Sequence, residues 1–285
     1  MSSLASPHPE QKGKMKRIIR VFPRRTKMTP TDAYAFVGDP PLMRPEADEV
    51  HISVTFTWDI KRACELYLAW RQYYKVVRIG GPAFRTLIQG FSPGLYIKKG
   101  ITFTSRGCNN SCPWCLVPQI EGRLKLLDIL PGWNIQDNNI LQTGKSHLKR
   151  VFAMLKKQNK AITFGGGLQS DLVNDWVAGN LADLPIDQLF LSADTWAALR
   201  PLEMAIRKLP FLNRRQLRCY VLLGFDKTES IEKARQRLEH VWEIGCLPFA
   251  QLYQPPDQYI EYSKEWKQLA RTWSRPAAMF SEMSE

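Results

Sequence analysis

Three cysteines lie within eight residues of one short segment, "RGCNNSCPWCLVP", at residues 106–118. Cys108, Cys112 and Cys115 have the spacing C-x3-C-x2-C, and no fourth cysteine lies nearby. Thiolates are ligands that suit zinc and iron–sulfur clusters. The segment therefore predicts a metal centre that takes three thiolates from a single loop.

Two kinds of metal centre are compatible with this spacing. A structural zinc site is closed and four-coordinate, so it needs a distant fourth ligand such as His147, His240 or another cysteine. A four-iron cluster held by three cysteines instead leaves one iron without a protein ligand. That open iron can bind a small molecule through an amine and a carboxylate.

The elements that must position this loop follow a regular alternation that begins at residue 99. Six apolar stretches predict strands at 100–105, 133–141, 161–167, 187–194, 218–225 and 248–254. Five segments between them predict helices at 119–130, 144–158, 171–181, 195–209 and 228–245. Such alternation favours an α/β fold with a parallel sheet. An eight-fold barrel takes about 250 residues, so we expect a partial (βα)6 TIM-like barrel.

The cysteine segment directly follows the first of these predicted strands. In barrels of parallel strands, the carboxyl ends of the strands carry the chemistry. The ends of the other predicted strands are polar or glycine-rich: Asp137, Asn138, Asn139, Gly165, Gly166, Gly167, Ser192, Asp194, Gly224, Asp226 and Gln251. We therefore expect these residues to face the cysteine loop.

The stretch "CNNSCPWC" resembles the signature of the radical S-adenosylmethionine (radical SAM) superfamily, C-x3-C-x-aromatic-C, with Trp114 at the aromatic position. The flanks resemble the subgroup that contains cobalamin-domain enzymes and methylthiotransferases. The resemblance implies a 4Fe-4S cluster on Cys108, Cys112 and Cys115 that is chelated by SAM. Reductive cleavage of SAM then gives a 5′-deoxyadenosyl radical that abstracts a substrate hydrogen. An external electron donor such as flavodoxin or ferredoxin is implied as a partner.

The resemblance also implies that residues after the second and third strands contact the cofactor. Asp137, Asn138 and Asn139 correspond to polar groups near the amino group of SAM. Their alternative role is an Asx-type turn or a helix cap. Gly165 and Gly166 allow a close approach of the backbone to a ligand, but a flexible turn between strand and helix is equally compatible with them.

Further cofactor contacts are implied after the fourth and fifth strands. Ser192 and Asp194 correspond to ribose contacts, although Asp194 could also cap the following helix. Gly224 lies in a segment that resembles the one packing on adenine. Trp114 is expected to contact adenine because it lies inside the signature, and its alternative role is that of a core aromatic.

Residues before the barrel predict a separate small module. We expect residues 1–14 to be disordered, residues 15–95 to form a Rossmann-like β/α module, and residues 96–285 to form the radical SAM partial barrel. In the module we expect strands at 16–22, 51–58 and 75–81, a helix at 59–74 capped by Asp59, and a Pro-rich loop before residue 50. Ile60, Ala63, Leu66 and Leu68 or Ala69 are expected to form the buried face of the helix.

The segment at residues 51–82 resembles the back half of a cobalamin-binding domain. The motif D-x-H-x-x-G is absent from it, and the module is short, which argues against bound cobalamin. Of the six cysteines, only Cys64 lies before residue 96, so a second cluster of the methylthiotransferase kind is not expected.

The chain carries 40 basic and 27 acidic residues, a net charge of +13. One acid-free run gathers Lys12, Lys14, Lys16, Arg17, Arg20, Arg24, Arg25 and Lys27. Such a run can bind nucleic acid or form a solvated tail and strand edge, so a nucleobase or nucleic acid is one candidate substrate. With no apolar run long enough for a membrane span and no signal sequence, we expect a cytoplasmic location. The alternative to an enzyme is a non-catalytic zinc- or nucleic-acid-binding protein with structural thiols.

Overall fold

The structure is a computed structural model that describes residues 16–84, 94–255 and 258–283. The chain divides into two compact units, Met1–Lys98 and Lys99–Glu285. The segment expected to be disordered, residues 1–14, lies outside the described residues. None of the described helices is long and apolar enough to cross a bilayer.

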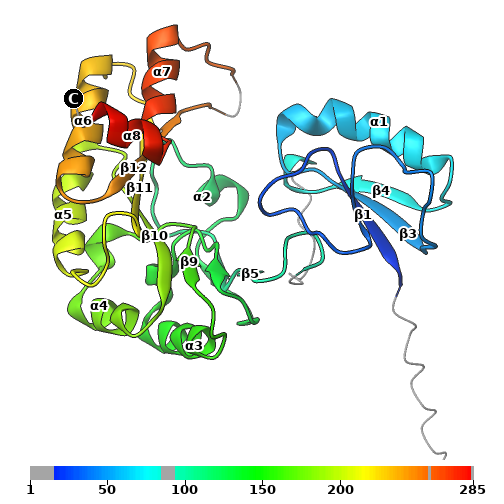
Figure 1. The fold of residues 1–285 in the computed structure, drawn as a ribbon, viewed down its shortest axis with the longest axis horizontal. Coiled ribbons are helices and arrows are strands. Elements are labelled where there is room, and N and C mark those ends of the chain that lie inside the picture. The colour runs from blue at the N-terminus through cyan, green and yellow to red at the C-terminus, as the bar shows by residue number, and fades with distance from the viewer. Residues whose placement is uncertain (1–15, 85–93, 256–257, 284–285) are drawn as a thin grey trace, which may run out of the picture. The chain divides into compact units, whose positions relative to one another are not determined.

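The first unit contains a four-stranded parallel sheet in the order β2-β1-β3-β4. Its strands are β1 (Ile18–Phe22), β2 (Ala35–Val37), β3 (Glu49–Ser53) and β4 (Val77–Gly80). Helix α1 (Ile60–Arg71) packs on this sheet (Figure 1). The core between them consists of Ile19, Val21, Val50, Ile52, Val54, Ala63, Leu66 and Trp70. The parallel β/α character expected for this region is therefore present.

Three local expectations for the first unit were wrong. The predicted loop before residue 50 contains β2, and the strand expected at 51–58 ends at Ser53. The chain then turns, and Trp58 stacks on Phe56 with a ring separation of 4.7 Å. Leu68 is 67% exposed, and Trp70 takes the buried position instead. Trp70 is held there because its indole N–H donates to the carbonyl of Gly38 at 3.1 Å.

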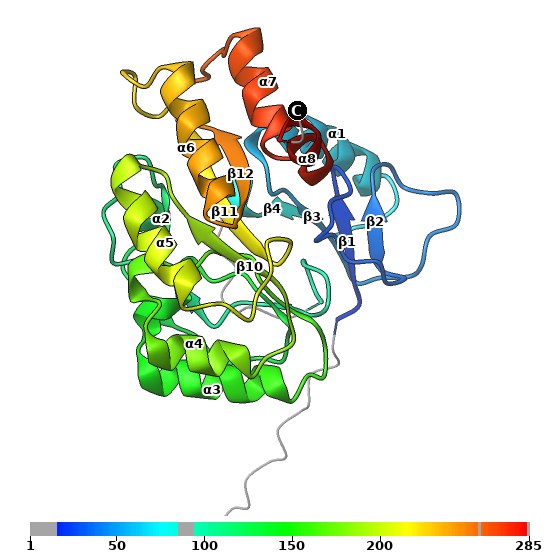
Figure 2. The same ribbon diagram turned by 60° about the vertical axis from the view of Figure 1, so that its left-hand side comes forward.

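The second unit is built on a six-stranded parallel sheet in the order β5-β8-β9-β10-β11-β12. The strands are β5 (Ile101–Thr102), β8 (Asn134–Ile135), β9 (Ile162–Phe164), β10 (Ile186–Ser192), β11 (Leu217–Leu223) and β12 (Leu247–Leu252). All six strands expected from the sequence are present, in sequence order. Within the described residues β5 and β12 are the two edges of the sheet, and no closed barrel forms (Figure 2).

Four helices cover one face of this sheet (Figures 1 and 2). They are α3 (Lys145–Lys156), α4 (Asp175–Ala182), α5 (Leu199–Arg207) and α6 (Ile231–Glu243). Alternate residues of each strand point into the core that these helices share with the sheet. In β11 these are Leu217, Cys219, Val221 and Leu223, all of them buried. Two further helices, α7 (Lys264–Thr272) and α8 (Pro276–Glu282), end the described chain.

The helix expected at residues 119–130 was wrong. Only a short helix α2 (Val117–Ile120) forms, and it is followed by strand β7 (Lys125–Leu126). That strand pairs antiparallel with β6 (Ser105–Arg106), which continues the chain beyond β5. The pairing closes a loop that contains the cysteine segment. Part of the sequence that was expected to be helical therefore forms one of the two strands at the base of this loop.

Candidate functional site

The three predicted metal ligands lie in the loop that is closed by β6 and β7. The backbone N–H of Cys108 donates to the carbonyl of Gly122 at 3.2 Å, and the N–H of Cys115 donates to the carbonyl of Cys112 at 3.0 Å. These bonds fold the loop back on itself. All three thiols are free and partly buried.

The thiols interact with one another and with two carboxylates, Asp194 and Glu121. Burial raises the pKa of the Cys112 thiol, and the negative charges of Cys115, Cys108 and Asp194 raise it further. Burial raises the pKa of Cys115, and Cys108 and Asp194 again add to the rise. Thiolates gathered beside a carboxylate need a positive countercharge, which bound metal ions supply. The donor set therefore suits a metal centre.

The geometry does not suit a single ion. Among the described residues no group of three or more His, Cys, Asp or Glu side chains is placed to hold one metal ion. A closed zinc site on the three thiols would need all three sulfurs about 2.3 Å from one ion, with a fourth ligand such as His147 or His240. A cubane binds each thiolate to a different iron, and it therefore takes ligands that are farther apart.

Asp137, two residues after the end of β8, anchors the entrance to the cysteine loop. Its carboxylate accepts hydrogen bonds from the backbone N–H of Thr104 at 2.7 Å, the hydroxyl of Thr104 at 2.6 Å and the hydroxyl of Ser105 at 2.6 Å. Burial raises the pKa of Asp137, and these hydrogen bonds oppose the rise. The side chain thus connects β8 to the segment that leads into the cysteines.

The next two residues extend this connection along the loop. The side-chain oxygen of Asn138 accepts the backbone N–H of Gly107 at 3.0 Å. The amide of Asn139 donates to the sulfur of Cys108 at 3.8 Å, while its own oxygen is buried without a partner among the described residues. The three polar residues that the sequence singled out therefore bind successive points of the loop, and the side-chain oxygen of Asn139 remains available as an acceptor beside Cys108.

Two glutamines that the sequence reasoning missed complete this network. The side-chain oxygen of Gln169 accepts amide N–H groups from Asn110 at 3.0 Å, Asn139 at 2.7 Å and Gln142 at 3.0 Å. Gln142 in turn accepts the backbone N–H of Asn109 at 2.9 Å. Gln142 comes after β8 and Gln169 after β9. This position is the only sequence signal that could have indicated them, because uncharged amides are not distinctive in a sequence.

The paired glycines after β9 allow two strand ends to approach closely. A Cβ atom at Gly166 would lie 1.9 Å from the carbonyl oxygen of Asp137, so no other residue fits there without a backbone shift. The carbonyl of Gly165 accepts the hydroxyl of Tyr220 at 2.8 Å. These contacts give both glycines a packing role in the chain itself.

Trp114 and Asp194, which were expected to contact the cofactor, lie next to each other. The ring of Trp114 packs on Phe225 with a centroid separation of 4.3 Å, and the Trp114 side chain lowers the pKa of the nearby Asp194 carboxyl slightly. Asp194 accepts the backbone N–H of Leu222 at 2.9 Å. Burial raises the pKa of Asp194, and the hydrogen bond from Leu222 and the charge of Arg237 oppose the rise. Ser192 ends β10 and pairs with Tyr220 of β11.

The open side of Gly224 is covered by an aromatic ring of the chain itself. Gly224 has a φ of +72°, which favours glycine, and a Cβ atom there would lie 2.8 Å from the ring of Tyr262. The hydroxyl of Tyr262 donates to the carbonyl of Tyr253 at 2.8 Å. The absent side chain at Gly224 therefore admits Tyr262.

A buried arginine on α6 fixes the ends of β10 and β11, and the sequence reasoning missed it. The guanidinium of Arg237 donates to the carbonyls of Ala193, Asp194 and Leu222 at 3.0, 2.8 and 2.9 Å. It also pairs with Glu229 at 2.7 Å, and both side chains are almost fully buried. Arg237 thereby sets the position of the backbone that carries Asp194.

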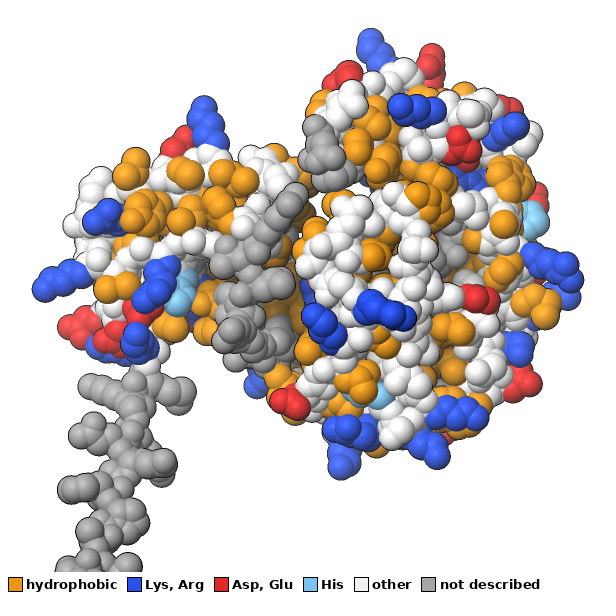
Figure 3. Space-filling view, turned by 180° about the vertical axis from the view of Figure 1, so that it is seen from behind, with side chains coloured by type: hydrophobic (Ala, Val, Ile, Leu, Met, Phe, Trp, Pro, Cys, Tyr) orange, Lys and Arg blue, Asp and Glu red, His pale blue; other side chains and the backbone are white. Residues whose placement is uncertain are grey.

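The basic run near the N-terminus is largely neutralised where the structure describes it. Four of its six described members form ion pairs: Lys16 with Glu49, Arg17 with Glu46, Arg20 with Asp32, and Arg24 with Asp59. On the face drawn in Figure 3, basic and acidic side chains alternate beside the described start of the chain. The Asp59 carboxylate accepts Nε of Arg24 at 2.7 Å and does not cap α1 as expected.

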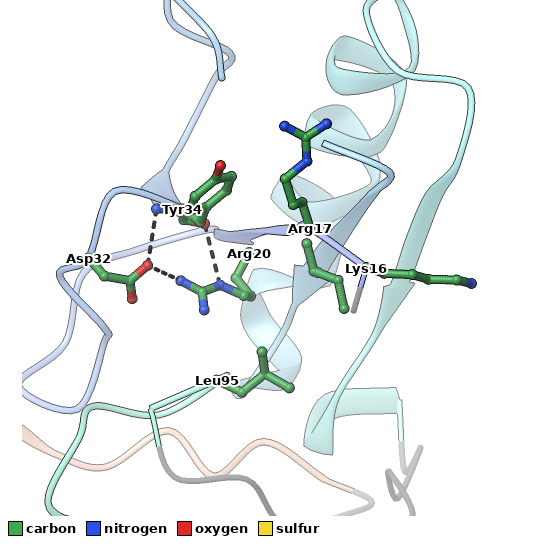
Figure 4. A pocket seen from close by; sticks show the side chains of 7 residues that line it. Lys16, Arg17, Arg20, Asp32, Tyr34 and Leu95 are labelled. Carbon is green, nitrogen blue, oxygen red and sulfur yellow. Dashed lines mark hydrogen bonds and ion pairs between the residues drawn. The ribbon is translucent and has the colours of Figure 1, made fainter. Parts of the chain in front are cut away.

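A cavity of about 230 Å³ lies beside this run in the first unit. Figure 4 shows the guanidinium of Arg20 directed at Asp32, whereas the ends of Lys16 and Arg17 point away from it. The cavity therefore does not gather unpaired positive charge around a phosphate.

No protein-family model matches the chain, and a search of curated proteins finds none that is significantly similar. The case for a function therefore depends on the geometry of the cysteine loop and of the strand ends around it.

Proposed function

We propose that this protein is a radical SAM enzyme whose 4Fe-4S cluster is held by Cys108, Cys112 and Cys115. One observation carries the proposal. Three interacting thiols lie in a single loop at the carboxyl ends of parallel strands, and among the described residues no side chain joins them to close a mononuclear site. Such a cluster, once bound with SAM and reduced by a donor such as flavodoxin or ferredoxin, supplies a 5′-deoxyadenosyl radical.

The fold supports the proposal at the level of architecture. Six parallel strands follow one another in sequence order with helices on one face, which is the arrangement expected of a partial (βα)6 barrel. The loop follows the first strand, so its ligands lie at the edge of the sheet where such folds carry their chemistry.

The chain's own residues would hold the cofactors and exclude water. Asn139 offers an unpartnered buried oxygen to the amino group of SAM. Asp194 and Trp114 lie close to each other beside the thiols, where a ribose and an adenine ring would lie. Gln142 and Gln169 hold the loop in place, so the cysteines are positioned before a cluster arrives.

The test is anaerobic reconstitution of the full chain with iron and sulfide, followed by reduction in the presence of SAM. We expect about four irons per chain and formation of 5′-deoxyadenosine. Cys112→Ala should abolish both cluster assembly and SAM cleavage, whereas Cys64→Ala, at an exposed thiol of the first unit, should change neither.

Two results would overturn the proposal. One is a colourless protein with a single tightly bound zinc, which would favour structural thiols. The other is an intact, reduced cluster that never cleaves SAM, either alone or with candidate substrates.

A further inference from the structure

The two faces of the sheet in the second unit differ in chemistry. The face under the helices is aliphatic, with residues such as Leu189, Leu191 and Val221. The opposite face presents polar and aromatic side chains that are only partly buried: Asn134, Thr163, Gln188, Phe190, Ser192, Arg218, Tyr220 and Phe249. This composition differs from that of a packed core and leaves polar and aromatic groups on this face that can contact a ligand.

Three aromatic rings form a continuous wall on that face. Phe190 stacks on Tyr220 with ring centroids 4.7 Å apart, and Phe249 meets Tyr220 edge to face at 5.7 Å. The Tyr220 hydroxyl is occupied because it donates to Gly165. The wall therefore offers ring faces and edges to a planar or apolar group.

Arg218 lies in register with Phe190 on this same face, one step before Tyr220 on β11. Its Nε and Nη1 atoms are buried and have no hydrogen-bond partner among the described residues. Burial also lowers the pKa of its guanidinium. A guanidinium keeps its charge in proteins, so burial without an anion leaves two charged donors unsatisfied.

We propose that Arg218 binds an anionic group of the substrate, a carboxylate or a phosphate, while the body of the substrate packs on Phe190, Tyr220 and Phe249. The guanidinium presents N–H donors in a fork that matches either anion. The word substrate rests on the proposed function, but the anion site does not, because its residues hold neither the cluster nor SAM.

The position of Arg218 also limits the size of this substrate. Gly224 follows the end of the same strand, six residues after Arg218, and strands rise about 3.3 Å per residue. The backbone of Arg218 therefore lies roughly 20 Å from the carboxyl end of the strand, and the anion lies closer to that end by as much as the arginine side chain reaches. A compound that spans this gap has an anionic end, a planar or apolar middle, and its reactive hydrogen at the far end.

The binding test uses the reconstituted full chain and two probes, phenyl phosphate and benzoate, titrated by calorimetry. At least one should bind to the wild type, and the tighter of the two identifies the anion. Arg218→Gln should weaken that binding about tenfold or more, and Arg218→Lys should retain part of it. Arg215→Gln, at an exposed arginine three residues earlier, should leave it unchanged.

A stability measurement separates a ligand role from a structural one. Without ligand, Arg218→Met removes two buried and unpartnered donor atoms of a partly buried guanidinium, so it should raise the melting temperature by about 2 °C or more. The inference is overturned if neither probe binds, if Arg218→Gln binds as well as the wild type, or if Arg218→Met melts lower. Anion binding through Arg218 in a chain that never cleaves SAM would refute the proposed function alone.

Discussion

Replacement of Arg237 by methionine should destabilise the second unit strongly. The guanidinium makes four hydrogen bonds of 2.7–3.0 Å, three to backbone carbonyls and one to Glu229. Each bond to a charged group contributes about 1.5–3 kcal/mol, but the freed carbonyls recover part of this through water. Breaking a buried ion pair costs about 3–5 kcal/mol because the remaining charge stays buried. We therefore expect a loss of about 3–5 kcal/mol in the free energy of unfolding.

Arg235 provides a matched control on the same helix. It pairs with Glu282 at 3.1 Å, but both side chains are substantially exposed. Exposed pairs contribute about 0–1 kcal/mol, so Arg235→Met should change the free energy of unfolding by less than about 1 kcal/mol. Arg237→Lys keeps the charge but loses the fork, and its effect should lie between the two.

The assay is anaerobic urea unfolding of the full chain, followed by far-UV circular dichroism. The double variant Arg237→Met with Glu229→Gln removes both charges, so it should lose about 1–3 kcal/mol less than the sum of the single variants. The reasoning is refuted if Arg237→Met lowers the free energy of unfolding no more than Arg235→Met does. It is also refuted if the loss in the double variant equals the sum of the two single losses.

Three further predictions concern the site and the first unit. Gly166→Ala places a methyl group 1.9 Å from the Asp137 carbonyl oxygen, so it should lower the free energy of unfolding by about 2 kcal/mol or more. The control Gly179→Ala lies in open space on α4 and should raise the free energy of unfolding by about 0.5–1 kcal/mol in the same urea titration. Asp137→Ala leaves the buried Thr104 N–H without an acceptor and should lower both stability, by about 1–3 kcal/mol, and the iron content after reconstitution; full iron loading would contradict its anchoring role. The pKa of Glu49 is lowered to about 2, mainly by the hydrogen bond from Lys16, so its stabilising effect is present above pH 4.5 and disappears as the pH falls toward 2. The difference in melting temperature between wild type and Glu49→Gln should therefore shrink between pH 5 and pH 2.

The repeated strands were predictable because each is short, apolar and bounded by turn residues. From Leu217 to Leu223, buried residues alternate with partly buried ones, and this period of two predicts a strand from the sequence itself. The segment at 119–130 was not predictable in this way, since its apolar residues have helical spacing. Leu126 is 55% exposed on β7, because pairing with β6 overrides local preference.

The proposed metal ligands and the strand-end residues could be singled out from the sequence because their types are distinctive. The residues that hydrogen-bond to them could not be found from the sequence, because only the folded structure shows which side chains lie close together. Arg237 looks like any charged residue of an exposed helix face, and only the fold shows it buried against the ends of β10 and β11. Asp137 was singled out from the sequence as a cofactor contact, which stays a prediction, and its hydrogen bonds to Thr104 and Ser105 depend on a strand pairing that no local pattern encodes.

The hydrogen bonds from the residues after β8 to the cysteine loop have a consequence for biogenesis. Asp137, Asn138 and Asn139 bind the loop through groups of the polypeptide alone. If the loop holds the proposed cluster, the polypeptide should fold first and receive the cluster last, from a carrier protein that needs only an open loop. A cluster lost by oxidation could then be rebuilt in the folded protein, without new protein synthesis or the help of a chaperone.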